Sequence, residues 1–180
     1  MAAAYLPLNR RPHSRVLRIP ADDAIPLVPI LAVPYLAFLP IYWLTVIESC
    51  ARDRNFAQLA NTATLVYGVS NLTYLFFQTH VPRPNLDSDQ PGAGLVRYIY
   101  SHDQPYCDFP SEHASSAVLL ALHLHAARSP LRVPASGLSL SVLSATLLLK
   151  QHTIAGTLGG ALLAPVAWAL MRRRYRSSPT

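Results

Sequence analysis

Charged residues are scarce in this 180-residue chain: Asp, Glu, Lys and Arg together make up 13%, whereas hydrophobic residues make up 51%. The mean hydropathy is +0.23 although several polar stretches interrupt the sequence, so the apolar residues are concentrated in long runs. A chain of this length forms one domain. The composition therefore predicts an integral, multi-pass membrane protein.

Lysine is almost absent, and the formal charge of +6 comes from arginines together with the single Lys150. These arginines lie in the terminal segments and in short loops between apolar runs, where basic residues anchor membrane proteins at lipid headgroups. The distribution argues against nucleic-acid binding and favours membrane lipids as partners. Both predicted faces collect similar numbers of basic residues, so membrane orientation stays open, as does the oligomeric state.

Cysteine is limited to Cys50 and Cys107, with no spacing typical of a metal site, and we expect two free thiols. The first twenty residues are basic and contain prolines. The apolar run that follows is long and lacks a small-residue cleavage site, so it does not read as a cleaved signal peptide.

Five apolar segments predict the fold class: an all-α, polytopic transmembrane helical bundle of about five spans. They cover residues 24–47, 56–78, 111–127, 134–149 and 152–171. Four prolines in the first segment predict a kinked helix or two half-helices. Tyr35, Tyr42 and Trp43 in this segment are typical of interfacial aromatic belts.

The polar remainder completes the predicted organisation. Residues 1–23 form a polar N-terminal tail, 24–171 a membrane-embedded domain and 172–180 a basic C-terminal tail. Residues 48–54 predict a short turn and 79–110 a long loop, and long structured loops are commonly functional. Two spans separate the loop at 79–113 from residues 150–152, so both should lie on the same face.

Polar groups next to apolar runs in a membrane protein tend to mark function, and here they suit phosphoryl transfer. Arg83 and Lys150 supply the positive charge that a phosphoryl group needs. His113 and His152 can serve as nucleophile and general acid. Ser111 adds a hydroxyl at a predicted helix N-terminus, where free backbone N–H groups attract anions.

These residues also form recognisable signatures. Arg83-Pro84, Pro110-Ser111-Glu112-His113 and His152 resemble, in order and spacing, the three motifs of the type 2 phosphatidic acid phosphatase superfamily. The run from Tyr100 to His113 and the ending Lys150-Gln151-His152 look like a branch with inositol-phosphotransferase and inositol phosphorylceramide synthase-like members. The resemblance covers about residues 74–160.

The resemblance implies an all-helical bundle with its pocket at the membrane face and with no metal or other cofactor. It implies that His152 is the nucleophile and His113 the general acid. It also implies that Arg83, Lys150 and Ser111 hold the phosphoryl group of a phospholipid or other lipid phosphate.

The sequence departs from the family pattern at three positions. Phe76 stands where the first motif has lysine, and Glu112 where the second has glycine; we expect Glu112 to point outward or to pair with an arginine. Gly156 stands where an aspartate normally orients the nucleophile, one helical turn after it. Asp108 or Glu112 could supply that carboxylate instead. The run from Gly156 to Gly160 also fits close helix packing.

We therefore expect a membrane-embedded enzyme that moves the phosphoryl group of lipid phosphates through a phosphohistidine, with water or an alcohol as acceptor. The chain is about one span short of the family's usual six. Alternatives are a catalytically impaired protein of the same fold, lacking the aspartate at Gly156, and a haem or metal carrier that uses the histidines. His123 and His125 read more simply as bundle residues that bond across helices.

Overall fold

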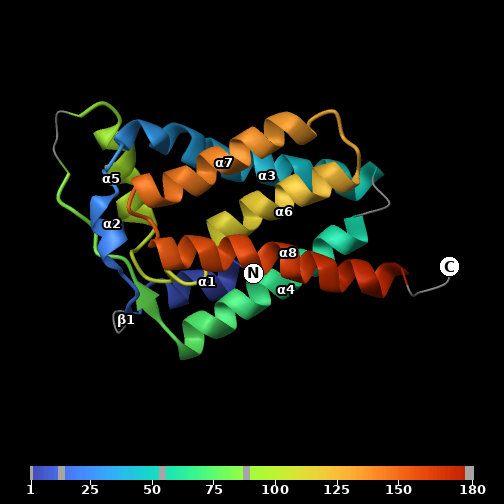
Figure 1. The fold of residues 1–180 in the computed structure, drawn as a ribbon, viewed down its shortest axis with the longest axis horizontal. Coiled ribbons are helices and arrows are strands. Elements are labelled where there is room, and N and C mark those ends of the chain that lie inside the picture. The colour runs from blue at the N-terminus through green and yellow to red at the C-terminus, as the bar shows by residue number, and fades with distance from the viewer. Residues whose placement is uncertain (1, 12–14, 53–55, 87–89, 177–180) are drawn as a thin grey trace.

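The computed structural model describes residues 2–11, 15–52, 56–86 and 90–176, and Figure 1 shows its helical bundle. Its long helices are α3 Ala32–Arg52, α4 Phe56–Phe76, α6 Glu112–Ala126, α7 Arg132–Leu148 and α8 Ile154–Arg176. Each corresponds to one predicted apolar segment, and the all-α class is confirmed. By length and composition, residues 29–50 and 154–174 qualify as membrane spans, and α7 is a shorter apolar helix. Five spans remain a prediction.

Two prolines lie near the start of the first apolar segment, and its long helix starts only after them, at Ala32. The short helix α2 covers Pro20–Ala24, and a 3₁₀ turn, η1, covers Pro29–Leu31 before α3 begins. Pro26 lies in the extended link between them, since its ring and missing N–H do not suit a helix interior. At its other end α3 continues to Arg52, so the turn predicted from residue 48 is helical to that point. The rest of that predicted turn lies outside the described residues.

The N-terminal segment is folded against the bundle, although the sequence predicted a polar tail. Helix α1, Ala2–Leu8, packs beside α4, and Gln78 donates a hydrogen bond to the carbonyl of Leu8 at 2.9 Å. Strand β1, Arg15–Val16, pairs in parallel with β2, Thr79–His80. These contacts anchor residues far upstream of the bundle to the loop that follows α4.

Two other predicted polar segments also contain helix. Within the long loop, α5 spans Ala93–His102 and buries Val96 and Ile99 against α3 and its flanking turn. At the other end of the chain, α8 continues through the arginines expected to begin the C-terminal tail. The remaining residues, 177–180, lie outside the described residues.

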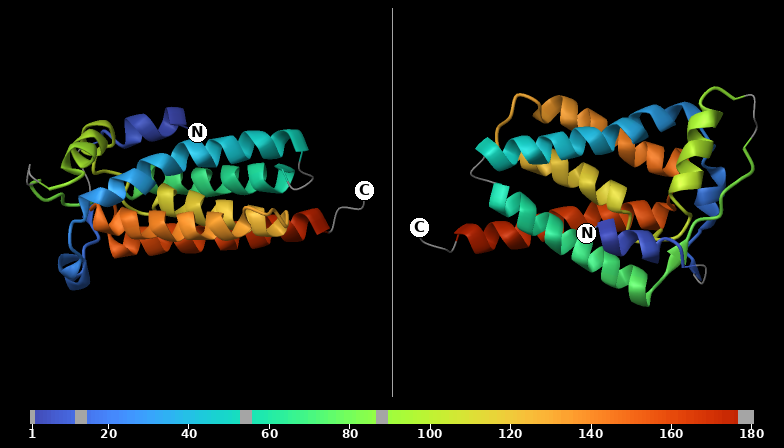
Figure 2. Two further views of the ribbon diagram at one scale, coloured as in Figure 1. Left: turned by 90° about the horizontal axis from the view of Figure 1, so that it is seen from above. Right: turned by 180° about the vertical axis from the view of Figure 1, so that it is seen from behind.

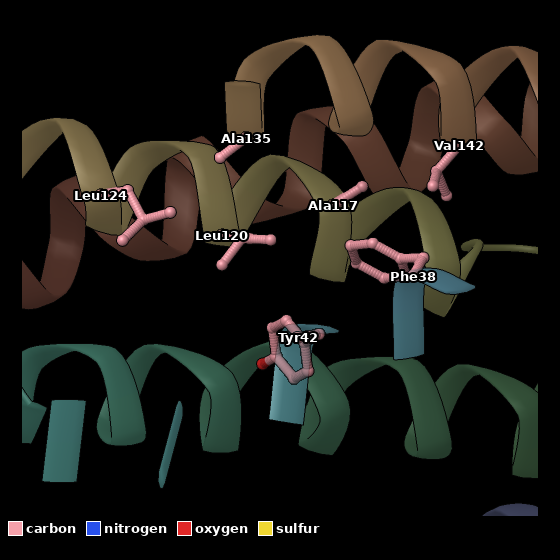
Figure 3. Close-up of a cluster of buried hydrophobic side chains, with 7 residues drawn as sticks. All are labelled: Phe38, Tyr42, Ala117, Leu120, Leu124, Ala135 and Val142. Atoms are coloured by element: carbon pink, nitrogen blue, oxygen red, sulfur yellow. The ribbon is translucent and has the colours of Figure 1, made fainter. Parts of the chain in front are cut away.

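One hydrophobic cluster joins three of the long helices (Figure 3). It contains Phe38 and Tyr42 of α3, Ala117, Leu120 and Leu124 of α6, and Ala135 and Val142 of α7. Tyr35 and Tyr42 are only 3% and 2% exposed, so the interfacial position predicted for them is wrong. Trp43 is 53% exposed, so its place in an interfacial aromatic belt stays a prediction.

The loops that carry the sequence motifs gather at one end of the bundle. Helices α2 and α5 and strand β1 cluster there, and the C-terminus lies at the opposite end (Figures 1 and 2). An isolated bridge links His80 to Tyr106 across the long loop, and Arg83 donates a hydrogen bond to Gln151. The prediction that residues 79–113 and 150–152 share one face of the bundle is confirmed.

Candidate active site

Ser111 lies at the N-terminus of α6, as the sequence predicted, and in the structure it caps that helix. Its Oγ accepts the N–H of Ala114 at 3.2 Å, and its own N–H donates to the carbonyl of Gly156 at 2.9 Å. The first hydrogen bond satisfies a backbone donor at the N-terminus of α6. The second ties that N-terminus to the first turn of α8. Ser111 is therefore fully buried, and its position fixes His113 in the first turn of α6.

His113 lies between Tyr35 and His152. The Tyr35 and His113 rings stack with centroids 4.5 Å apart, and the Tyr35 hydroxyl lies 3.3 Å from Nδ1 of His113. The centroids of His113 and His152 are 6.1 Å apart. The two predicted catalytic histidines thus face one site. Sequence reasoning missed Tyr35, because a tyrosine within an apolar run gives no signal of the partner it will meet.

Asp108 contacts His152 through both its backbone and its side chain. The Nδ1 of His152 lies 2.9 Å from the Asp108 carbonyl and 3.6 Å from its Oδ1. A carbonyl only accepts hydrogen bonds, so Nδ1 carries the ring hydrogen and neutral His152 presents the lone pair of Nε2. Burial alone would raise the pKa of Asp108, but His152 and hydrogen bonds from Thr153 hold it below its ordinary value.

Arg83 lies beside the residue that precedes His152. Its guanidinium stacks over the Tyr100 ring at 4.2 Å, donates to the Tyr100 carbonyl at 3.2 Å and donates to Oε1 of Gln151 at 2.9 Å. Two buried donors at this contact have no hydrogen-bond acceptor among the described residues: Nε of Arg83 and Nε2 of Gln151. Burial lowers the pKa of Arg83, and Asp103 opposes that shift. Such partly desolvated donors suit a bound anion.

Gln151 is a functional candidate that sequence reasoning did not single out. It was visible only as the middle residue of the motif Lys150-Gln151-His152, and its contact with Arg83 joins residues 68 positions apart. Lys150 itself faces the N-terminal segment. Its Nζ donates to the carbonyl of Asp22 at 2.8 Å, and its backbone has a φ of 51°. Phosphate contact by Lys150 therefore stays a prediction.

A cavity of about 600 Å³ opens beside His113. Its lining comes from α1, α3, α4 and α6 and is largely aromatic or apolar: Tyr5, Leu39, Trp43, Tyr67, Glu112, His113 and Ser116. The position of Glu112 differs from the prediction, because its side chain faces this cavity and its buried Oε1 accepts no hydrogen bond from the described residues. A cavity of this size holds a small molecule or part of a lipid chain.

The remaining predicted histidines bond across helices. Nε2 of His123 lies 2.8 Å from the Ser49 hydroxyl, and Nε2 of His125 lies 3.0 Å from the Ser136 hydroxyl. Across the described ranges, no three His, Cys, Asp or Glu residues lie in an arrangement that could hold a metal ion. Cys50 and Cys107 are both free thiols, as predicted.

Residues 55–178, more than half of the chain, match the family model of the PAP2 superfamily. The chain belongs to the PAP2 superfamily. This match contains α4, α6, α7 and α8 together with Arg83, His113 and His152, whereas α1 to α3 precede it. PAP2 proteins are generally phosphatase-type enzymes, so membership indicates phosphoryl transfer from phosphate esters. No curated protein and no solved structure matches the chain.

Proposed function

We propose that this PAP2 protein is a membrane-embedded enzyme that transfers the phosphoryl group of a lipid phosphate to water or an alcohol. The observation that carries the proposal is that His113 lies beside His152 while Arg83 bonds to Gln151, the residue before His152. His113 also lines a largely apolar cavity. Two imidazoles and a cation provide a nucleophile, a proton donor and charge stabilisation without a metal.

The reaction proceeds in two displacements. The Nε2 lone pair of His152 attacks phosphorus, the bond from phosphorus to the ester oxygen breaks, and the leaving alcohol takes a proton from His113. A water or alcohol oxygen then attacks the phosphohistidine and gives its proton to His113, and the bond between phosphorus and Nε2 breaks. Arg83 and Gln151 stabilise the charge on the phosphoryl oxygens. The family resemblance assigns Lys150 and Ser111 to the same oxygens.

The cavity supports a lipid as substrate. Leu39 and Trp43 of α3 line it and are 43% and 53% exposed, and His113 of α6 lines the same cavity. An alkyl chain in this cavity would replace water around apolar side chains, at about 25 cal/mol for each Å² buried. A phosphate joined to that chain would then lie next to the histidines.

The acceptor sets the class of the enzyme. Water gives a lipid phosphatase, and an alcohol gives a phosphotransferase. The run from Tyr100 to His113 and the motif Lys150-Gln151-His152 resemble the inositol-phosphotransferase and inositol phosphorylceramide synthase-like branch. That resemblance makes transfer to a polyol the second outcome to measure.

The direct test uses purified protein in vesicles that contain phosphatidate, with and without inositol. We expect release of inorganic phosphate or formation of a new phospholipid. His152→Gln should lower the rate at least about 1,000-fold, because it removes the nucleophile. His113→Gln should lower it about 100-fold or more, because it removes the acid.

His125→Gln is the matched control, because His125 bonds to Ser136 on α7 and lines no part of the histidine site. It should keep the wild-type rate. Equal product formation by wild type, His152→Gln and His113→Gln would overturn the proposal. Absence of product from wild type across phosphate monoesters and diesters would favour a catalytically impaired protein.

A further inference from the structure

Gly156, at the position where the family has an aspartate, faces a filled space. A Cβ atom built on Gly156 would overlap the backbone carbonyl and Oδ1 of Asp108. Backbone atoms cannot move aside as the end of a flexible side chain does. No side chain fits at position 156 unless the segment before α6 shifts.

The group that fills this space is a carboxylate. Asp108 is fully buried, its Oδ1 accepts the N–H of Thr153 at 2.8 Å, and its Oδ2 accepts the Thr153 hydroxyl at 2.7 Å. The Thr153 hydroxyl in turn accepts the N–H of Gly156 at 3.1 Å. These hydrogen bonds hold the carboxylate at the start of α8, with Oδ1 3.6 Å from Nδ1 of His152.

We propose that Asp108 is the positioning residue for His152, and that Gly156 provides the space that Asp108 requires. The carboxylate that orients the nucleophile thus comes from the segment before α6 instead of from the next turn of α8. This inference rests on the proposed function, in which Nε2 of His152 attacks phosphorus. The backbone carbonyl of Asp108 fixes the orientation of the His152 ring, and the carboxylate of Asp108 stabilises the positive charge that develops on that ring.

Glu112, the other carboxylate considered from the sequence, does not take this place, since it lines the cavity beside His113. A purely structural role for Asp108 is the competing explanation, because a carboxylate that accepts the N–H of Thr153 also stabilises the N-terminus of α8. The two explanations predict different kinetics. A structural role lowers stability, whereas a positioning role lowers the rate of a folded enzyme.

Asp108→Asn separates these effects, because asparagine keeps the shape and one oxygen that accepts the N–H of Thr153 but removes the charge. Its Nδ2 donates to the Thr153 hydroxyl, in place of the carboxylate oxygen that accepts from it. We expect kcat to fall about 10- to 100-fold with KM and the melting temperature nearly unchanged. The pH dependence of kcat should change as well. Asp23→Asn, at an exposed carboxylate paired with Arg18, is the matched control and should behave as wild type. Wild-type kcat and an unchanged pH profile in Asp108→Asn would overturn the proposal.

Substitution of the glycine gives an independent test. Gly156→Ala should lower kcat by displacing Asp108, and Gly156→Asp should do the same although it adds the family's carboxylate. Higher activity in Gly156→Asp would contradict the inference. Gly137→Ala, where the added methyl group meets no atom within 4 Å, is the control. Should either Gly156 variant fail to fold, Asp108→Asn still decides.

Nitrogen-15 NMR of histidine-labelled protein tests the inference without turnover. The His152 signals are assigned as those that disappear in His152→Gln. At alkaline pH they should show Nδ1 protonated and Nε2 unprotonated in the wild type. In Gly156→Ala they should show a mixture of the two tautomers. A wild-type ring protonated on Nε2 would overturn the role of Asp108. If the protein turns over no phosphate ester, the proposed function fails, and this spectrum still tests the contact between Asp108 and His152.

Discussion

At the scale of single residues, Arg83 shows why an arginine suits this site better than a lysine. Its guanidinium stacks on the Tyr100 ring while two of its nitrogens donate to Tyr100 and Gln151, which leaves the buried Nε without an acceptor in the described part of the chain. A planar group with several donors can keep these contacts and still bind an anion. A lysine ammonium cannot make the same set.

Arg83→Lys should therefore lower kcat/KM about 10- to 100-fold, the cost of losing a charge-assisted hydrogen bond to the transferred group. The measurement is a steady-state assay with phosphatidate vesicles, together with inhibition by inorganic phosphate. Arg97→Lys, on the exposed face of α5, is the control and should leave both unchanged. Normal kcat/KM and normal phosphate inhibition in Arg83→Lys would exclude Arg83 from anion binding.

At the scale of elements, the glycines of α8 allow the segment before α6 to approach the helix closely. Added Cβ atoms would meet Asp108 at Gly156, the Phe109 ring at Gly159 and the Ser111 carbonyl at Gly160. The close packing predicted from the run at 156–160 is therefore present, but at Gly156 and Gly159 the partner is the segment before α6, and α6 itself is close only at Gly160. This approach also allows Ser115 Oγ to donate to the Gly160 carbonyl at 3.0 Å.

Gly160→Ala should destabilise the fold by about 1–3 kcal/mol, because the methyl group has to displace backbone at the N-terminus of α6. Gly137→Ala should instead stabilise it by up to about 1 kcal/mol, since alanine favours helix and the site is open. Thermal or denaturant unfolding in detergent measures both. Equal stability of the two variants would show that the contact between α6 and α8 is loose.

At the scale of the whole molecule, the outer surface of the bundle is apolar. Leu158, Leu162, Val166 and Leu170 recur every four residues along α8 and are 50–64% exposed. Exposed stripes of this kind on one helix mark contact with lipid or another protein. Together with PAP2 membership and the two helices long enough to cross a bilayer, they favour membrane association.

The protein should therefore remain in the membrane fraction after washing with alkaline carbonate, because buried apolar helices are not released by high pH. Immunoblotting of pellet and supernatant measures this, with a peripheral protein bound by charge as the control. Release of the protein by carbonate would show that the arginine-rich segments attach it at the surface and that no helix spans the bilayer.

The N-terminal segment also helps to build the motif end of the molecule. Asp103, beyond the end of α5, accepts hydrogen bonds from the Tyr5 hydroxyl at 2.9 Å and from Nδ2 of Asn9 at 2.5 Å. Tyr5 in turn lines the cavity next to His113. Residues outside the family match thus form part of the wall of the site.

The sequence by itself determined the long helices, the position of Ser111 at a helix N-terminus and the meeting of the three motifs at one end of the bundle. These features depend on local signals: the length of an apolar run, a serine before a helix, and the number of segments between two loops. The family pattern in the sequence likewise marked His113, His152 and Arg83 as candidates, since a motif is read along the chain.

Only the tertiary structure decided which groups surround those candidates. Tyr35 stacks on His113 from 78 positions away, and Asp108 reaches His152 from 44 positions away. The N-terminal segment looked like a polar tail because its partners, such as Asp103, lie about 95 residues further along the chain. Contacts at such separations depend on how helices pack in three dimensions, and local composition does not encode that packing.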